Sequence, residues 1–154
     1  MKTRFVLALS LLLVWSAPLL AEGVLTPDPR LTPEQVIDIQ LRSLQHNDEP
    51  MTDAGIFQTW IFAHPDNKQA TGPLARFAQM IKSPHYRNMI NHRRHSIEAV
   101  VQTASRALFA VRLVAADGQK LAFQWELRKV EQGEHAGSWM TTLVSPPLRV
   151  GDST

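Results

Sequence analysis

The spacing of the apolar residues changes once along this chain, and that change limits the folds open to it. From Leu31 to Pro84 the apolar side chains recur every three to four residues, which is typical of amphipathic helices. Beyond that point they alternate with other residues, as from Ala107 to Ala115 and from Leu121 to Leu127, which is typical of strands. Helices followed by a run of adjacent strands indicate the α+β class.

The first helix has clear signals at both ends. Thr32 is placed to cap it, Pro33 occupies the first helical position, and Gln35 completes a capping box. Asn47 and Pro50 mark its end. A mostly apolar stripe predicts the face that packs on the core, and it consists of Val36, Ile37, Gln40, Leu41 and Leu44.

Two more helices are expected before the strands begin. The second is capped by Thr52 or Asp53 and ended by Pro65. The third starts at Pro73 and closes at Pro84. The segment between them, "AHPDNKQATG", is expected to be a connection without structure of its own.

Four strands are expected next, in an antiparallel meander. The Asp117-Gly118 pair predicts a hairpin turn between two of them. In the last strand, Trp139, Thr141 and Leu143 alternate on the inward face, and prolines end the strand. The predicted fold is therefore α+β, with three N-terminal helices packed on a curved four-strand antiparallel sheet.

The N-terminus predicts export. Lys2 and Arg4 precede a short apolar run, and small residues follow, so residues 1–23 match a signal peptide cleaved after Ala21 or Gly23. No later segment approaches the length of a membrane span, so we expect no transmembrane segment after cleavage. The expected location is periplasmic or secreted, in soluble form.

One domain is expected in the exported chain. A Pro-rich lead (24–31) precedes the domain (32–146), and a short tail (147–154) follows it. The chain has no cysteine, which excludes disulfides, thiolate metal sites and lipid attachment at a cysteine. Its stability must therefore come from a hydrophobic core.

Three segments resemble a known family. "LQHNDEPMTDAGI", "TGPLARFAQMIKSPHY" and "GSWMTTLV" are similar to an uncharacterised bacterial family, a domain of unknown function within the nuclear transport factor 2-like superfamily, also called the cystatin-like cone fold. The resemblance covers residues 32–145 and implies a cone of helices and curled sheet. It implies no catalytic residues, because that family has none assigned. Larger members carry a strand hairpin where this chain has "AHPDNKQATG", so we expect a shallower cone.

Charge is distributed unevenly along the chain. Residues 67–97 hold six basic residues and no acid, whereas residues 22–66 hold eight acidic residues and only two basic ones. Loss of Lys2 and Arg4 with the signal peptide leaves 14 basic residues against 14 acidic ones, which argues against a nucleic-acid partner. The basic window contains a candidate anion-binding set, namely Lys82, Arg87, Arg94 and His95. The alternative is a solvated patch.

His92 and His95 raise the question of a metal site. In a continuous strand they would point to opposite faces, so we expect them not to chelate one ion, and we expect no metal and no cofactor. Tyr86 follows His85, and cone-fold enzymes use such groups as general acids and bases. No pair of carboxylates and no nucleophile motif accompanies them, so no residue is assigned a catalytic role.

The remaining candidates are surfaces. Aromatic residues are expected to line a cleft between helices and sheet, and they are Trp60, Phe77, Tyr86, Phe123, Trp125 and Trp139. The other sheet face carries more apolar side chains than a solvated face needs, which suggests a homodimer through Leu108, Ala110, Val114, Met140 and Val144.

The sequence favours a non-enzymatic binding or interaction module, whose partner is a small apolar or anionic ligand or an envelope protein. One alternative is a small isomerase or cyclase that uses Tyr86 and a histidine. A second alternative is an envelope protein that contacts anionic lipid through its arginine cluster.

Overall fold

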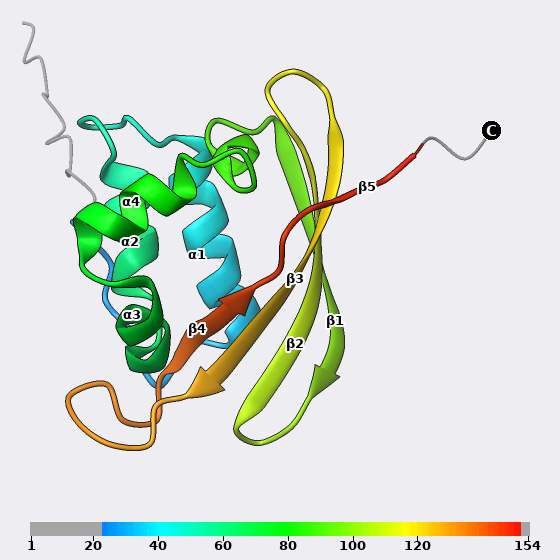
Figure 1. The fold of residues 1–154 in the computed structure, drawn as a ribbon. Coiled ribbons are helices and arrows are strands. Elements are labelled where there is room, and N and C mark those ends of the chain that lie inside the picture. The colour runs from blue at the N-terminus through cyan, green and yellow to red at the C-terminus, as the bar shows by residue number, and fades with distance from the viewer. Residues whose placement is uncertain (1–22, 152–154) are drawn as a thin grey trace, which may run out of the picture.

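The computed structural model of the protein describes residues 23–151. The predicted signal peptide lies outside the described residues, except for Gly23. The helices pack on one face of an antiparallel sheet, as Figure 1 shows. The helices are α1 (Pro33–Gln45), α2 (Ala54–Ile61), α3 (Pro65–Thr71), α4 (Leu74–Ile81) and the 3-10 helix η1 (Arg87–Met89). The strands are β1 (Arg94–Gln102), β2 (Arg106–Val114), β3 (Lys120–Lys129), β4 (Trp139–Val144) and β5 (Leu148–Arg149).

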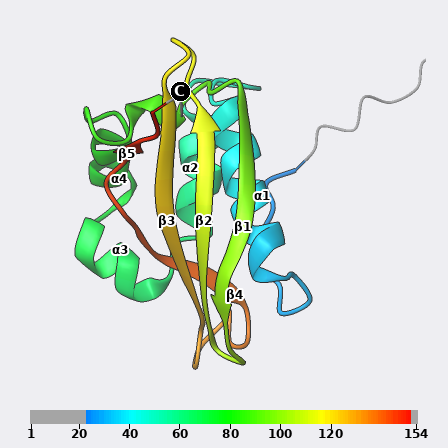
Figure 2. The same cartoon turned by 90° about the vertical axis from the view of Figure 1, so that its right-hand side faces the viewer.

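The strands follow each other in space as they do in sequence. The order is β1-β2-β3-β4, all neighbours are antiparallel, and β5 pairs with β3 beyond the end of β4. Figure 2 shows the outer face of β1, β2 and β3 toward the viewer, with the helices behind it. The α+β class and the antiparallel meander are thus confirmed, and β5 adds a short fifth strand after the prolines that were expected to end the sheet.

Two local predictions hold in atomic detail. The Thr32 hydroxyl accepts from the Gln35 amide, and the Gln35 side chain accepts from the Thr32 amide, which is the predicted capping box. Gly118 has φ 90°, the left-handed conformation that the turn between β2 and β3 requires and that glycine adopts freely.

The helix count was wrong, because Pro65 begins a helix instead of ending one. Helix α2 ends at Ile61, and α3 starts at Pro65 within the segment expected to be a plain connection. Proline lacks an N–H and therefore suits the first helical position. The Nδ1 atom of His64 accepts from the Asp66 amide and caps this helix.

Asp53 precedes α2, but its side chain does not cap that helix. It has φ 62° and its carboxylate accepts from Lys82 Nζ at 2.6 Å. The Asn47 side-chain oxygen accepts from the Ile56 amide instead, so the residue expected to end α1 also caps α2.

The core lies between the helices and the inner face of the sheet. The sheet contributes alternate residues of β2 and β3, and the largest of them are Phe109, Phe123 and Trp125. The first helix contributes its predicted apolar stripe, including the polar Gln40, and every residue of that stripe is buried. Trp139 also belongs to this core, as its alternation predicted.

The alternation in β4 fails after Thr141. A bulge places Leu127 opposite Thr141 but Glu126 opposite Leu143. The side chains of β4 after the bulge therefore point to the opposite faces from those that simple alternation predicts. Leu143, expected inside, is 53% exposed, while Val144, expected on the outer face, packs against the core. Met140, also expected outside, is 1% exposed.

The free edge of β4 is covered by the end of α2. The Thr141 amide donates to the Phe62 carbonyl at 2.9 Å, and the His64 amide donates to the Thr141 carbonyl at 2.8 Å. This contact holds α3 beside β4 and closes one side of the space between the two layers. Within residues 23–151, no helix has the length and apolar character needed to cross a bilayer.

Candidate functional site

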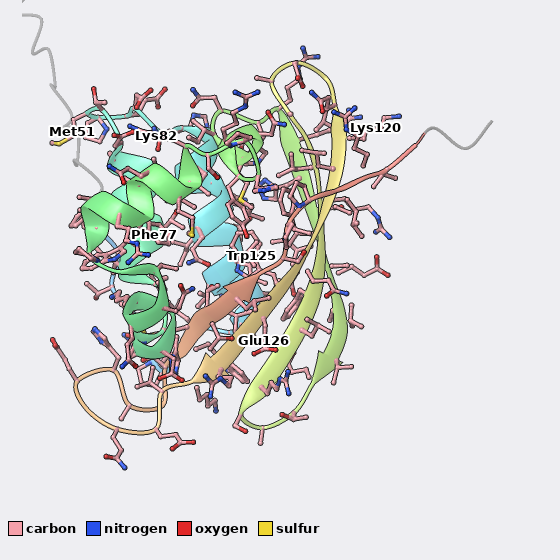
Figure 3. All side chains as sticks on the ribbon, in the orientation of Figure 1. Met51, Phe77, Lys82, Lys120, Trp125 and Glu126 are labelled. Carbon is pink, nitrogen blue, oxygen red and sulfur yellow. The ribbon has the colours of Figure 1, made fainter. Side chains whose placement is uncertain are left out.

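A cavity of about 220 Å³ lies between the helices and the end of the sheet formed by β3 and β4. Its walls come from α1, α2, α3, α4 and the two strands. Figure 3 labels Phe77 on the helix side and Trp125 on the sheet side. The apolar lining residues are Leu44, Ala63, Ala70, Phe77, Met80, Ile81, Met89, Trp125, Leu143 and Val144, and the polar ones are Gln40, Thr59, Asn67, Thr71, Tyr86, Thr141 and Thr142.

Three buried hydrogen bonds connect Trp125, Thr141, Gln40 and Thr59 in the cavity wall. Trp125 Nε1 donates to Thr141 Oγ1 at 3.0 Å, and that hydroxyl donates to Gln40 Oε1 at 2.7 Å. Gln40 Nε2 in turn donates to the Thr59 carbonyl at 3.1 Å. Because these groups satisfy one another, they fix the wall between α1, α2, β3 and β4, and they leave the cavity with a mainly apolar character.

Tyr86 supplies the hydroxyl at the other side of the cavity. It donates to the Val144 carbonyl at 3.1 Å, and burial raises the pKa of Tyr86. The phenol is therefore neutral at physiological pH, and its oxygen keeps the capacity to accept a hydrogen bond.

Electrically, the lining is neutral. Among the described residues that line this cavity there is no Asp, Glu, Lys, Arg or His. Charged ligands would lose their hydration without gaining a counter-charge, so the cavity suits an uncharged molecule.

The six aromatic residues expected to line a cleft divide into two groups. Phe77, Tyr86 and Trp125 do line the cavity. Phe123 and Trp139 lie in the core, and Trp60 packs beneath Lys68, whose Nζ is 4.3 Å from the ring centre. The sequence pattern does not mark Met80, Met89 or Thr141 as lining residues, whereas Gln40 is a polar residue within the apolar stripe of α1.

The isomerase or cyclase alternative needs a histidine beside Tyr86, and no histidine is among the described residues that line this cavity. His95 is not among the lining residues; it contacts His92 and Asp38. The ring of His85 stands edge-on to Tyr86 with 6.4 Å between centres, but His85 is exposed.

The expectation that His92 and His95 diverge was wrong. Strand β1 begins only at Arg94, and Asn91 has φ 54°, so His92 sits in a turn and not in the strand. Its Nε2 lies 2.7 Å from His95 Nδ1. That distance fits a hydrogen bond between the two ring nitrogens. Among the residues that the structure describes, no group of three or more His, Asp or Glu side chains is arranged to hold a metal.

The four candidate anion-binding residues do not gather at one place. Lys82 is paired with Asp53, Arg87 lies in η1, and His95 faces α1. Of the four, Arg94 and His95 both line a shallow groove of about 210 Å³ on the outer face of the sheet.

The other basic residues of this groove come from the neighbouring strands. Arg112 and Lys120 line it together with Arg94, Ser96 and Val114. The register explains the grouping, since Val114 pairs with Arg94 on one side and with Lys120 on the other. The sequence did not indicate this set, because Arg112 and Lys120 lie outside the acid-free segment of residues 67–97.

Comparison of the chain with protein-family models, with curated proteins and with solved structures gave no match.

Proposed function

We propose that this protein is an exported, non-catalytic binding module that holds a small uncharged apolar ligand between its helices and its sheet. The observation that carries the proposal is the cavity of about 220 Å³, whose lining residues include no charged side chain. An apolar site with a few fixed polar groups is the usual form of a small-molecule pocket.

The cavity volume limits the size of the ligand. It exceeds the ~150 Å³ of a dry protein cavity that accepts benzene. It is below the ~300–1,000 Å³ typical of pockets for drug-sized molecules. A mono- or bicyclic aromatic compound or a short alkyl chain fits between these limits, and Tyr86 offers it one hydrogen-bond acceptor.

Indole is a suitable probe, because it is neutral and bicyclic and has one N–H donor. We expect saturable shifts of the Met80 and Met89 methyl signals on titration with indole, followed by nuclear magnetic resonance. Indole-3-acetate should bind at least about tenfold more weakly, because its carboxylate finds no counter-charge.

Two alanines on the helices provide a matched pair of variants. Ala70 and Ala75 are both exposed, but only Ala70 lines the cavity. Ala70→Trp should therefore block the mouth and abolish the indole shifts, while Ala75→Trp should leave them intact. Equal binding by both variants, or no saturable shift in the unmodified protein, would contradict the proposal.

The enzyme alternative has less support than the binding module. Tyr86 is the only ionisable side chain among the lining residues, and its hydroxyl is engaged with Val144. General acid–base catalysis needs a group that changes its protonation near the working pH, which a tyrosine with a raised pKa does not supply.

We also propose that the domain is a shallow cone of the nuclear transport factor 2-like superfamily, within the uncharacterised bacterial family that its sequence resembles. Helices that precede a curved, open sheet and a cavity between the two layers support this. Export follows from the N-terminal sequence, and the mature protein should begin at Glu22 or Val24 when its N-terminus is sequenced. An intact Met1 on soluble protein would contradict export.

A second candidate function is contact with anionic lipid. The outer groove, defined by Arg94, Arg112 and Lys120, favours it because three basic residues surround one hollow.

The protein should bind vesicles containing phosphatidylglycerol more strongly than pure phosphatidylcholine vesicles, and salt should weaken the binding. Joint replacement of Arg94 and Lys120 by Gln should remove the difference, and binding that is insensitive to both changes would contradict this function.

A further inference from the structure

Two histidines connect α1 to the beginning of β1 through a continuous series of contacts. His92 is 2% exposed, and its Nδ1 lies 2.7 Å from the Met89 carbonyl oxygen. A carbonyl only accepts hydrogen bonds, so His92 Nδ1 must carry a hydrogen. The other ring nitrogen, Nε2, lies 2.7 Å from His95 Nδ1.

The far side of His95 meets a carboxylate. His95 Nε2 lies 3.4 Å from Asp38 Oδ1, and the second oxygen of Asp38 pairs with Arg42 Nε at 2.8 Å. A carboxylate at neutral pH also only accepts, so His95 Nε2 needs a hydrogen to bond there.

Two neutral rings do not carry enough hydrogens for these three contacts. The one hydrogen of a neutral His92 is used on Met89, which leaves its Nε2 bare. If neutral His95 carries its hydrogen on Nδ1, a bare Nε2 faces Asp38. If it carries the hydrogen on Nε2, two bare nitrogens face each other at 2.7 Å.

One additional proton, taken from water, satisfies every contact. His95 then carries hydrogens on both nitrogens and donates to His92 and to Asp38, while His92 donates to Met89. A second additional proton would place two N–H groups against each other between the rings. The observed geometry is therefore complete at one protonation level of the pair.

We propose that His92 and His95 form a proton-operated latch, in which one shared proton fastens the beginning of β1 to α1. The latch loosens when that proton is lost at higher pH, and again when a second proton arrives at lower pH.

The surroundings of the pair support this assignment of the proton to His95. Burial is the largest effect on His92 and lowers its pKa, while the hydrogen bond to the Met89 carbonyl opposes that effect, so the buried ring is the less favourable place for the additional proton. Charged groups act on the pair from α1, through Asp38 and Arg42, and from His46 directly after that helix. His95 also lines the outer groove, whose basic residues are Arg94, Arg112 and Lys120. On β2 the residue paired with His95 is the apolar Leu113.

The segment that the two histidines hold is also hydrogen-bonded to α1 at two other places. The Asn91 amide donates to the Leu44 carbonyl at 2.8 Å, and Gln45 Nε2 donates to the Arg93 carbonyl at 2.9 Å. Asn91 holds φ 54°, a conformation uncommon for a residue with a side chain. Opening of the latch should therefore appear as faster amide hydrogen exchange at Asn91.

Nuclear magnetic resonance of the exported chain with ¹⁵N-labelled histidine tests the proposal directly. At about pH 7, where histidines ordinarily titrate, we expect hydrogens on both nitrogens of His95 and on Nδ1 alone of His92. We also expect a scalar coupling through the hydrogen bond between His92 Nε2 and His95 Nδ1. A bare His95 Nε2 at this pH, or no such coupling between about pH 5 and 9, would overturn the latch.

Two variants of α1 should shift the proton loss in opposite directions. Asp38→Asn removes the anion, so the pair should release its proton about one pH unit lower. Arg42→Gln removes a cation that competes for the same carboxylate, so release should move to higher pH. His85→Gln, an exposed control, should leave it unchanged.

Arg42 is largely exposed, so its variant keeps the test valid even if Asp38→Asn fails to fold. A shift of the same sign in both folded variants, or no shift with Arg42→Gln, would show that Asp38 does not anchor the proton and would overturn the proposal.

Discussion

Gly55 of α2 lies so close to Ser43 of α1 that a Cβ built on Gly55 would stand 2.0 Å from the Ser43 carbonyl oxygen. The two helices cross at this glycine, and no side chain fits between their main chains.

Gly55→Ala should lower the free energy of unfolding by about 1–3 kcal/mol, because the methyl group forces α1 and α2 apart. Alanine is the better helix former by about 1 kcal/mol, so a stabilised variant would contradict the close approach. Gly151→Ala is a matched control, since a Cβ there meets nothing within 4 Å. Urea unfolding of the three proteins measures the difference.

The buried network of the cavity wall predicts unequal effects of two neighbouring threonines. Thr141→Val removes the acceptor of Trp125 Nε1 and the donor to Gln40, and should cost about 1–3 kcal/mol. The Thr142 hydroxyl bonds to Glu126 in a half-buried position where water can replace it, so Thr142→Val should cost less than about 1 kcal/mol. Equal losses in chemical denaturation would contradict the network.

The bulge in β4 predicts which large side chain of that strand supports the core. Trp139→Ala should lower the free energy of unfolding by about 3–5 kcal/mol, because it opens a cavity in the buried cluster. Leu143→Ala should cost under about 1 kcal/mol, since Leu143 is mostly exposed. A large loss at Leu143 would mean that the strand keeps simple alternation.

Stability should fall as the pH falls below about 6.5, and His64 should account for part of the loss. Burial lowers the pKa of His64, and its bare Nδ1 accepts from the Asp66 amide. When the pH falls below the pKa that His64 has in the unfolded chain, the unfolded chain binds a proton there that the folded protein does not yet bind. Proton binding therefore favours unfolding.

His64→Asn provides the measurement, because asparagine keeps a capping oxygen and does not titrate. Between about pH 5 and 8, the melting temperature of this variant should depend less steeply on pH than that of the unmodified protein. An unchanged dependence would exclude His64 as a contributor.

The homodimer that the sequence suggests would use the outer face of the sheet, with a changed set of residues. Leu108, Ala110 and Val114 remain on that face and are half-buried, whereas Met140 and Val144 are withdrawn from it. Val101 and Leu143 join Leu108 instead, since Val101 pairs with Leu108 and both Val101 and Leu143 are exposed. We expect a dimer in light scattering and a monomer for Leu108→Lys. A monomer at millimolar concentration of unmodified protein would contradict the dimer.

The sequence alone determined the features that depend on neighbouring residues. The capping box at Thr32, the turn at Gly118 and the inward faces of α1, β2 and β3 all follow from contacts within a few residues or from a regular period. The same period placed the polar Gln40 on the inward face of α1, where it is buried and hydrogen-bonded.

The tertiary structure alone decided the features that depend on contacts between distant elements. The bulge in β4 changes the face of Leu143 and Val144, and the Phe62–His64 segment covers its edge. The turn at Asn91 removes His92 from the strand and brings its ring onto His95, across from Asp38. Periodicity cannot indicate either feature, because an inserted residue or a left-handed residue resets the period without a mark in the apolar pattern. The energy that selects these conformations comes from pairing with elements far away in the chain.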